Sequence, residues 1–295
     1  MPGDSEDRAG QPAGWRLEPS PAIRLLLLAP FVALLGLFFV LPLVRIFWIA
    51  LTEPTFGLQH LREFLASAAS RRALANTMRV SAIVTVLSLL VGALVAWELR
   101  WTRSRWRRLL LWSAVLFPLW TSVVVRMYAF TILLQREGIV NRLLQALHVT
   151  AGPVPLLYTD TAVTLGMLYA MFPYAILPLY ASFVNIDAEL IQAAESLGAS
   201  RLGAFVTVVV PLAVPSMLAS AAIVFVIAVG FYVTPVLLGG PSSAFLATRV
   251  DQQLFMLFDF PAAAATGSVL LVTAIVIVGL AWRAVGLERI QRSLA

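Results

Sequence analysis

Side chains that commonly carry out enzyme chemistry are scarce in this chain. It contains no cysteine, and its two histidines, His60 and His148, are far apart in the sequence. The carboxylates do not cluster, so no stretch combines a nucleophile with a base or gathers a set of metal ligands. All 21 basic residues are arginine, and without lysine a Gly-x-x-x-x-Gly-Lys-Ser/Thr phosphate loop cannot form. The sequence predicts no catalytic residue, metal site or cofactor, so any ATP that drives this protein is hydrolysed by another chain.

One charged side chain lies where a charge is costly. Arg126 falls within the long apolar stretch 109–134, and a charge inside a membrane usually faces protein or water. The side chain can line a path for a solute, or pair with Asp160, Asp251 or Asp259, or reach the headgroups as an anchor. An unpaired guanidinium would repel a polycation, which favours a zwitterionic or anionic cargo.

Aromatic side chains are the other candidates for contact with a solute, because their faces attract ammonium groups. Tyr232 lies beside Gly230 and ahead of Pro235, where a distorted helix would expose backbone carbonyls to a cavity. We therefore assign Arg126, Tyr128 and Tyr232 to the predicted substrate path. Tyrosine is also a common anchor at membrane interfaces, and that interpretation stays open for both tyrosines.

The composition is that of a polytopic membrane protein. Hydrophobic residues make up 60% of the chain and charged residues 12%, and the mean hydropathy is +0.90. The net charge of +6 and the pI near 10.4 do not indicate nucleic-acid binding. The arginines flank apolar stretches and do not alternate with aromatics on a soluble face, so they are better explained as determinants of membrane topology.

The pattern of apolar segments predicts an all-α fold with six transmembrane helices. A helix needs about 20 residues to cross a hydrocarbon core of about 30 Å. Residues 1–22 are expected to form a disordered cytoplasmic tail, residues 23–285 the transmembrane domain, and residues 286–295 a cytoplasmic tail. The six apolar segments are approximately 23–51, 77–99, 109–134, 161–184, 206–238 and 262–283.

The distribution of arginines predicts the orientation of these helices. One side of the membrane carries the N-terminal tail, the 100–108 turn, the 187–203 segment and the C-terminus, which together hold more arginines than the longer connections opposite them. The side richer in positive charge normally stays in the cytoplasm. Both termini and the 187–203 segment are therefore expected to face the cytoplasm.

The 187–203 segment is polar and helix-forming, yet it lies between two apolar stretches. Asp187 can cap a short helix, Glu189 would lie in its positive first turn, and Gly198 is placed to end it. This helix is too short to span a bilayer, so we expect it to lie on the membrane surface and offer a small apolar face to a groove in a partner protein. The residues on that face are Leu190, Ile191, Ala194 and Leu197.

The spacing in this segment resembles the cytoplasmic signature loop of binding-protein-dependent ABC importer permeases. That loop has a Glu-Ala-Ala run, a glycine four residues after the second alanine, and Ile-x-Leu-Pro beginning ten residues beyond the glycine. This chain departs from the pattern at Gln192, Val208 and Val210. The resemblance implies that the loop couples to ATPases, through Gln192, Ala193, Ala194, Glu195, Gly198 and Pro211.

The resemblance covers most of the chain, from about residue 23 to 285. As a set, the segments 125–134, 138–141, 157–159, 172–180 and 231–241 are similar to the spermidine/putrescine type of permease, specifically the first of its two permease subunits. This implies a bacterial inner-membrane subunit that carries a polyamine-like small amine. It would assemble with a second permease subunit, two cytoplasmic ATP-binding subunits and a periplasmic substrate-binding protein.

The mechanism predicted from this resemblance is a two-state gate. Closure of the ATPase pair on ATP would push the 187–203 helices together and tilt the connected stretches 161–184 and 206–238, which would open an outward cavity. Gly198 permits a sharp bend beside the short helix, and Pro211 weakens the backbone ladder where the next stretch begins.

Other functions predict features that this sequence lacks. An ion-coupled secondary transporter would use membrane-buried carboxylates or histidines and often shows repeated halves, but buried acids are almost missing and residues 23–150 do not resemble residues 161–285. A membrane-bound enzyme would need a catalytic constellation. An importer of the same mechanism that carries an opine or another zwitterionic or anionic amine is the open alternative for the cargo.

Overall fold

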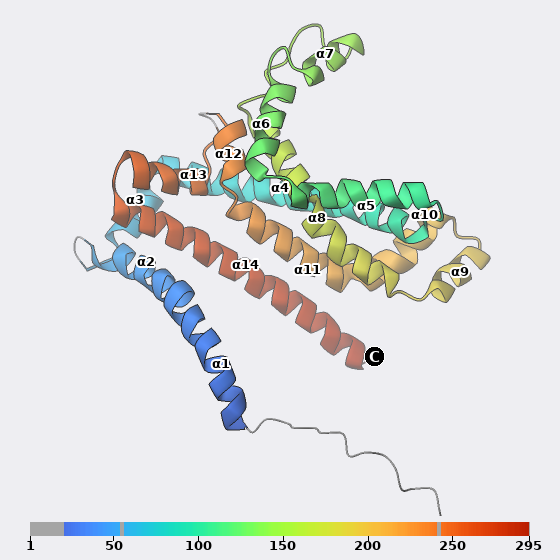
Figure 1. Cartoon of the computed structure of the whole chain (residues 1–295), viewed down its shortest axis with the longest axis horizontal. Coiled ribbons are helices and arrows are strands. Elements are labelled where there is room, and N and C mark those ends of the chain that lie inside the picture. The colour runs from blue at the N-terminus through green and yellow to red at the C-terminus, as the bar shows by residue number, and fades with distance from the viewer. Residues whose placement is uncertain (1–20, 54–55, 241–242, 295) are drawn as a thin grey trace, which may run out of the picture. The chain divides into compact units, whose positions relative to one another are not determined.

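The computed structural model describes residues 21–53, 56–240 and 243–294, and the predicted tail at residues 1–20 lies outside them. The described residues form helices and connecting turns and contain no β-strand (Figure 1). The all-α fold is thereby confirmed. The last helix, α14, runs from Phe260 to Leu294, so residues 286–294 continue it.

The chain divides into two compact units, with the boundary after Trp48. The first unit contains α1 (Pro21–Leu35), the π-helical turn η1 (Gly36–Val40) and most of α2 (Leu41–Thr52). A proline, Pro42, follows η1 closely. Proline has no N–H for the α-helical ladder and its ring crowds the carbonyl four residues before it, which accounts for the local widening of the helix.

The second unit, residues 49–295, is built around four long helices that lie side by side (Figure 1). They are α4 (Ala68–Trp101), α8 (Asp160–Val184), α11 (Val210–Val229) and α14. Shorter helices connect them, and α3 (Gln59–Ala66) precedes α4. We call the part of this unit where α4 and α8 begin the α13 end, and the part where they finish the α9 end.

Small residues let α4 pack closely inside the bundle. Its buried positions include two runs at four-residue spacing, one through Ala73, Thr77 and Ser81 and one through Ser88, Gly92 and Ala96. A Cβ added at Gly92 would lie 3.3 Å from Cβ of Ala175 and 3.4 Å from Cγ1 of Ile176, both on α8. Van der Waals packing of small residues drives helix association in membranes, so this stripe explains why α4 and α8 lie together.

The core of the second unit consists of two main apolar clusters, and α8 contributes to both. Val163 and Met167 lie in the cluster near the α13 end, where they pack with residues of α4 and α6. Leu179 and Phe183 lie in the cluster near the α9 end, together with Trp97 of α4. All of these side chains except Trp97 are essentially inaccessible to solvent, so α8 is the central helix of this unit.

The predicted third span is present as a bent pair of helices and not as one straight helix. The stretch 109–134 is divided between α5 (Arg105–Trp120) and α6 (Val123–Leu134). The segments Arg105–Trp120 and Val123–Ala146 meet at a bend of 110°. Thr121 Oγ1 donates to the carbonyl oxygen of Phe117 at 3.2 Å, the acceptor that the Thr121 N–H would use in a continuing helix. The chain leaves the helix at Thr121, whose backbone is extended with φ of −100° and ψ of 144°, and α6 leads into α7 (Ile139–Ala146).

The predicted fifth span, 206–238, is also interrupted. Its main helix, α11, ends at Val229, and α12 begins at Val233 and ends at Leu238. Pro235 supplies no N–H to Phe231, and Gly230 weakens the helix before it. Beyond α12 lie α13 (Leu246–Asp251) and the π-helical turn η3 (Gln252–Met256). Five described helices can cross a membrane by length and composition, or up to six if the bent pair is one span.

Candidate functional site

The short helix predicted after the fourth span is present as α9 (Ala188–Ser196). Asp187 Oδ1 accepts a hydrogen bond from the Glu189 N–H at 2.9 Å, which caps the first turn as predicted. The Gly198 N–H donates to the Glu195 carbonyl at 3.0 Å. Gly198 has φ of +93°, a backbone conformation that residues other than glycine rarely adopt, so this glycine ends the helix.

The apolar face of α9 is divided between the bundle and the surface. Ile191 is only 1% exposed and belongs to the cluster of Phe183 and Leu179, so it anchors the helix. Leu190 is 49% exposed and Leu197 is 90% exposed. A leucine that is almost fully exposed on an anchored helix offers an apolar contact to a partner, because such surface normally requires cover.

The predicted coupling residues lie around this exposed leucine. The side chains of Gln192, Ala193 and Glu195 are exposed and that of Ala194 is half-buried. Pro211 is exposed as well, but it lies further along the chain in the first turn of α11. The structure therefore places four of the six residues on α9 itself. Gly198 lies just beyond its end, and Pro211 lies in the first turn of α11.

The connection from α9 to α11 contains an irregular helix. Ser200 Oγ accepts from the Gly203 N–H at 3.1 Å and begins α10 (Arg201–Ala204). The π-helical turn η2 (Phe205–Val209) follows, and Pro211 comes two residues after it. As at Pro42, the missing proline N–H accounts for the wider turn. Wide turns of this type often mark functional segments of helices.

A contact that the sequence did not reveal ties the root of α9 to the end of α4. Arg100 donates through Nη1 to the carbonyl oxygen of Phe183, and through Nη2 to that of Ile186 at 2.6 Å. Its guanidinium carbon lies 5.2 Å from the centre of the Trp101 ring, and the carboxylate of Asp187 attracts its charge. Hydrogen bonds that involve a charged group contribute about 1.5–3 kcal/mol each, so this is a strong connection.

Aromatic rings extend the same connection to α10 and η2. The guanidinium of Arg201 lies 6.0 Å from the ring centres of both Trp97 and Trp101. The Trp97 ring in turn lies 5.0 Å from that of Phe205, and Phe205 contacts the ring of Phe183 at 6.0 Å between centres. The segments on both sides of α9 therefore pack against the same part of α4.

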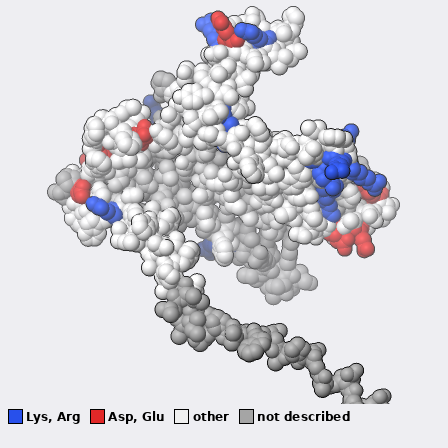
Figure 2. All heavy atoms as spheres, in the orientation of Figure 1, with Lys and Arg blue, Asp and Glu red and all other residues white. Residues whose placement is uncertain are grey.

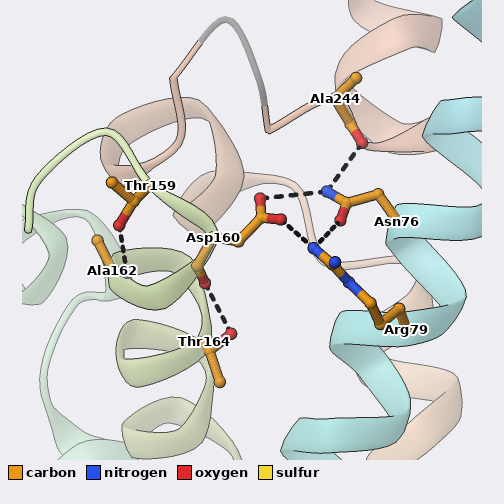
Figure 3. A network of polar contacts seen from close by, with 7 residues as sticks. All are labelled: Asn76, Arg79, Thr159, Asp160, Ala162, Thr164 and Ala244. Atoms are coloured by element: carbon orange, nitrogen blue, oxygen red, sulfur yellow. Dashed lines mark hydrogen bonds and ion pairs between the residues drawn. The ribbon is translucent and has the colours of Figure 1, made fainter.

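At the α13 end, a polar network joins α4, α8 and the segment before α13 (Figure 3). Arg79 forms an ion pair with Asp160, the first residue of α8, and donates to Asn76 Oδ1 at 2.9 Å. The Asn76 amide donates to Asp160 Oδ1 at 3.3 Å and to the carbonyl oxygen of Ala244 at 3.2 Å. This network fixes three segments that are far apart in the sequence.

The three carboxylates considered as partners of Arg126 have other contacts. Asp160 pairs with Arg79, Asp251 raises the pKa of the Tyr232 hydroxyl through their interaction, and Asp259 Oδ1 accepts from the Ala262 N–H at 3.0 Å. Arg126 lies 5.7 Å from the centre of the Tyr169 ring, and its Nε donates to the Ser122 carbonyl at 3.4 Å. Of the alternatives considered for Arg126, pairing with one of these three carboxylates is not seen among the described residues, and its contacts are an aromatic ring and a backbone carbonyl.

A cavity of about 960 Å³ lies at the α13 end, between α4, α12 and α13. The charged side chains in its wall are Arg72, Arg249 and Asp251. Tyr232 lies at the break between α11 and α12, and its pKa is raised by Asp251 of the wall. The predicted path residues Arg126, Tyr128 and Tyr232 are not among the described residues that line the cavity.

Charged side chains gather at the ends of the second unit. Figure 2 shows a group of basic and acidic side chains where α9 and α10 lie in Figure 1, and few charged side chains on the middle of the same face. The exposed charged residues at the α9 end are Arg103, Arg105, Arg107, Arg108, Asp187, Glu189, Glu195 and Arg201. An apolar middle between charged ends fits a protein that crosses a bilayer. Within the described residues, no three His, Cys, Asp or Glu side chains form a metal-binding group.

Comparison with known proteins agrees with this architecture. A family model described as a binding-protein-dependent transport system inner membrane component matches residues 88–286. The spermidine/putrescine transport system permease protein PotB of Escherichia coli (strain K12) is 31% identical over 211 residues, which cover 72% of this chain and 76% of that protein. PotB of Haemophilus influenzae is 31% identical over 186 residues, which cover 63% of this chain and 65% of that protein.

Solved structures show the same fold at lower sequence identity. A chain of a bacterial ABC transporter that imports the acidic polysaccharide alginate has a TM-score of 0.73 at 20% identity, with 90% of this chain and 95% of that chain covered. A chain of the MetNI methionine ABC transporter has a TM-score of 0.56 at 15% identity and covers 72% of this chain and 93% of its own length. With the family match over residues 88–286, these results show that the chain belongs to the family of binding-protein-dependent transport system inner membrane components.

Proposed function

We propose that this chain is a permease subunit of an ATP-driven importer and that α9 is its contact with a cytoplasmic ATPase. The observation that carries this proposal is the pairing of an anchored Ile191, 1% exposed, with a Leu197 that is 90% exposed on the same short helix. A rigidly held helix with an exposed apolar tip can bind in a groove and transmit a push. The ATP is hydrolysed in separate chains, since this one lacks lysine.

The assembly consists of this chain, a second permease subunit, two cytoplasmic ATP-binding subunits and a periplasmic substrate-binding protein, in the lipid bilayer of a bacterial inner membrane. The family description, which names a binding-protein-dependent system and an inner membrane, supports this composition. Arginines at the α9 end support a cytoplasmic position for α9 and for both termini. The cavity at the α13 end then faces the periplasm.

The cargo is a polyamine-like small amine. The relatives named as spermidine/putrescine permeases support this class. Aromatic faces and the carboxylate of Asp251, which lines the cavity and interacts with Tyr232, would suit an ammonium group. Asp251 acts here as a binding group.

A second candidate cargo is an opine or another zwitterionic or anionic amine. The arginines favour it, because Arg72 and Arg249 outnumber Asp251 among the charged side chains in the wall of the cavity. A guanidinium attracts a carboxylate and repels a polycation. The two classes of cargo share the ammonium group and differ in the carboxylate.

Transport follows from a two-state equilibrium that ligands bias from both faces. Closure of the ATPases on ATP would move α9, and α9 is continuous with α8 on one side and with α10, η2 and α11 on the other. Displacement of these helices opens the cavity at the α13 end to the periplasm, where the loaded binding protein releases its cargo. Gly198 and the wide turn η2 give α9 freedom to move relative to α11.

The test is reconstitution of the complex in liposomes with its binding protein. We expect radiolabelled putrescine or spermidine to enter the liposomes only with ATP, and the loaded binding protein to stimulate ATP hydrolysis. A panel of opines and amino-acid derivatives distinguishes the second class of cargo. Purification of the permease without a copurifying ATPase, together with uptake driven by an ion gradient, would refute the importer mechanism.

A further inference from the structure

We propose that Arg100 is the positioning residue that transmits the displacement of α9 to α4. This inference rests on the proposed function and extends it, because α4 is not adjacent to α9 in the chain. Arg100 reaches Phe183 and Ile186 across 83 and 86 residues of sequence. It thereby gives α9 a connection to the bundle in addition to its covalent links to α8 and α10.

The contacts of Arg100 are made to backbone, at the point where α8 ends and the turn to α9 begins. Phe183 lies in the last turn of α8, and Ile186 precedes Asp187, the cap of α9. Carbonyl groups in the last turn of a helix lack the usual partner four residues on. The Phe183 carbonyl accepts from the Ile186 N–H at 3.3 Å and accepts from Arg100 as well. A bond to backbone moves with the backbone, so a shift at the root of α9 pulls directly on Arg100.

Helix α4 can carry this displacement to the other end of the bundle. It is a single helix of 34 residues that packs closely on α8 through Gly92. Near its beginning, Ala73 and Asn76 line the cavity at the α13 end. A continuous helix held at Arg100 therefore connects the turn before α9 with the wall of that cavity.

An arginine suits this role better than a lysine. Its planar fork donates to both carbonyl oxygens at once while its face lies 5.2 Å from the centre of the Trp101 ring. A lysine keeps the positive charge but presents one flexible ammonium and loses the fork geometry. Arg100→Lys and Arg100→Gln therefore form a graded pair of variants, and the exposed Arg105 on α5 offers a control, Arg105→Gln, with the same change of charge at the same end.

The functional test compares these variants in the reconstituted complex with its binding protein, ATPases and a radiolabelled putrescine probe. Arg100→Gln is expected to assemble in normal yield but to import about 5-fold less solute for each ATP hydrolysed, or even less, since coupling between sites typically amounts to factors of about 5–150. Arg100→Lys should fall between it and the wild type, and Arg105→Gln should match the wild type. An unchanged ratio of solute to ATP in Arg100→Gln would overturn the inference, as would a loss of uptake explained wholly by a lower yield of complex.

A second measurement does not depend on transport. The chain has no cysteine, so spin labels at Leu94→Cys on α4 and Glu195→Cys on α9, both at exposed positions, are unique in the full-length chain. Arg100→Gln should broaden the distribution of distances between these labels, and Arg105→Gln should not. A distribution in Arg100→Gln as narrow as that of the wild type would refute the inference. A wild-type complex that lacks ATP-dependent uptake would instead refute the proposed function, while the label distances still test Arg100.

Discussion

Arg79 on α4 forms an ion pair with Asp160, the first residue of α8. At the other end of the same two helices, Arg100 of α4 donates to the carbonyl oxygen of Phe183, in the last turn of α8. The two helices therefore run in the same direction and are tied at both ends, with a stripe of small residues packed between the ties. This arrangement holds α4 and α8 together as a pair, so a displacement at the α9 end of one helix is shared by the other.

The ion pair between Arg79 and Asp160 at the α13 end is expected to contribute little to the free energy of unfolding by itself. The side chains of Arg79 and Asp160 are 60% and 31% exposed, and exposed ion pairs typically contribute about 0–1 kcal/mol. A double-mutant cycle with Arg79→Ala and Asp160→Asn, read out by the free energy of unfolding in detergent, should give a coupling energy within that range. Arg62→Ala, at an exposed position on α3, is the control. A coupling energy of several kcal/mol would contradict the exposed positions of these two side chains.

The end of α9 depends on the backbone conformation of Gly198. Its φ is +93°, and a Cβ at this position would meet no heavy atom within 4 Å, so any cost of substitution comes from backbone strain. Gly198→Val should lower the binding-protein-stimulated uptake and uncouple ATP hydrolysis, because a residue with a branched side chain strongly resists positive φ. Gly198→Asn should retain much more activity, since asparagine tolerates this region. Equal loss in the two variants would point to the size of the side chain instead of the backbone.

Much of the site was predictable where local chemistry decides the structure. Asp187 and Gly198 bracket α9 because capping and positive φ are properties of single residues and their immediate neighbours. The distortion expected beside Gly230 and Pro235 in the fifth span is present, and the missing N–H of Pro235 accounts for it. The bend in the third span was missed because an apolar stretch has the same composition whether it is straight or broken.

The connection through Arg100 had no signature in the sequence. Its acceptors are backbone carbonyls of Phe183 and Ile186, and every residue has such a group, so no pattern of side chains marks them. The partners of Asp160 and Asp251 were unpredictable for a related reason. Which carboxylate meets Arg79, Tyr232 or Arg126 depends on how helices distant in sequence are aligned, and only the packed structure decides this.

Close packing at Gly166 on α8 should make this position sensitive to added volume. A Cβ there would lie 2.6 Å from Cδ1 of Leu238 and 2.9 Å from Cγ2 of Thr234, so these two buried side chains of α12 would have to give way. Gly166→Ala is expected to lower the free energy of unfolding by about 1–3 kcal/mol. Gly267→Ala on α14 is the matched control, because its Cβ would meet nothing within 4 Å and alanine favours a helix by about 0.5–1 kcal/mol over glycine. Equal stability of the two variants would contradict the observed packing.

Asn141 on α7 holds the segment between α7 and α8 in place through its side-chain amide. Its Nδ2 donates to the carbonyl oxygens of Gln135 at 3.2 Å and Val154 at 3.0 Å, and its Oδ1 accepts from the Val154 N–H at 2.9 Å. The residue is 0% exposed, so water cannot replace these bonds. Asn141→Ala should therefore lower the free energy of unfolding by about 1–3 kcal/mol.

Two further variants test whether the segment depends on the hydrogen bonds of Asn141 or on the stability of α7 as a whole. Asn141→Asp keeps an acceptor for Val154 N–H but sets a carboxylate against the two carbonyl oxygens, so it should destabilise at least as much as Asn141→Ala. Gln145→Ala changes an exposed side chain on the same helix and should have little effect. Protease cleavage within residues 149–157 should increase in both Asn141 variants and stay at the wild-type rate in Gln145→Ala. If cleavage increases equally in all three, the segment depends on the stability of α7 as a whole, and the amide of Asn141 is not what holds it.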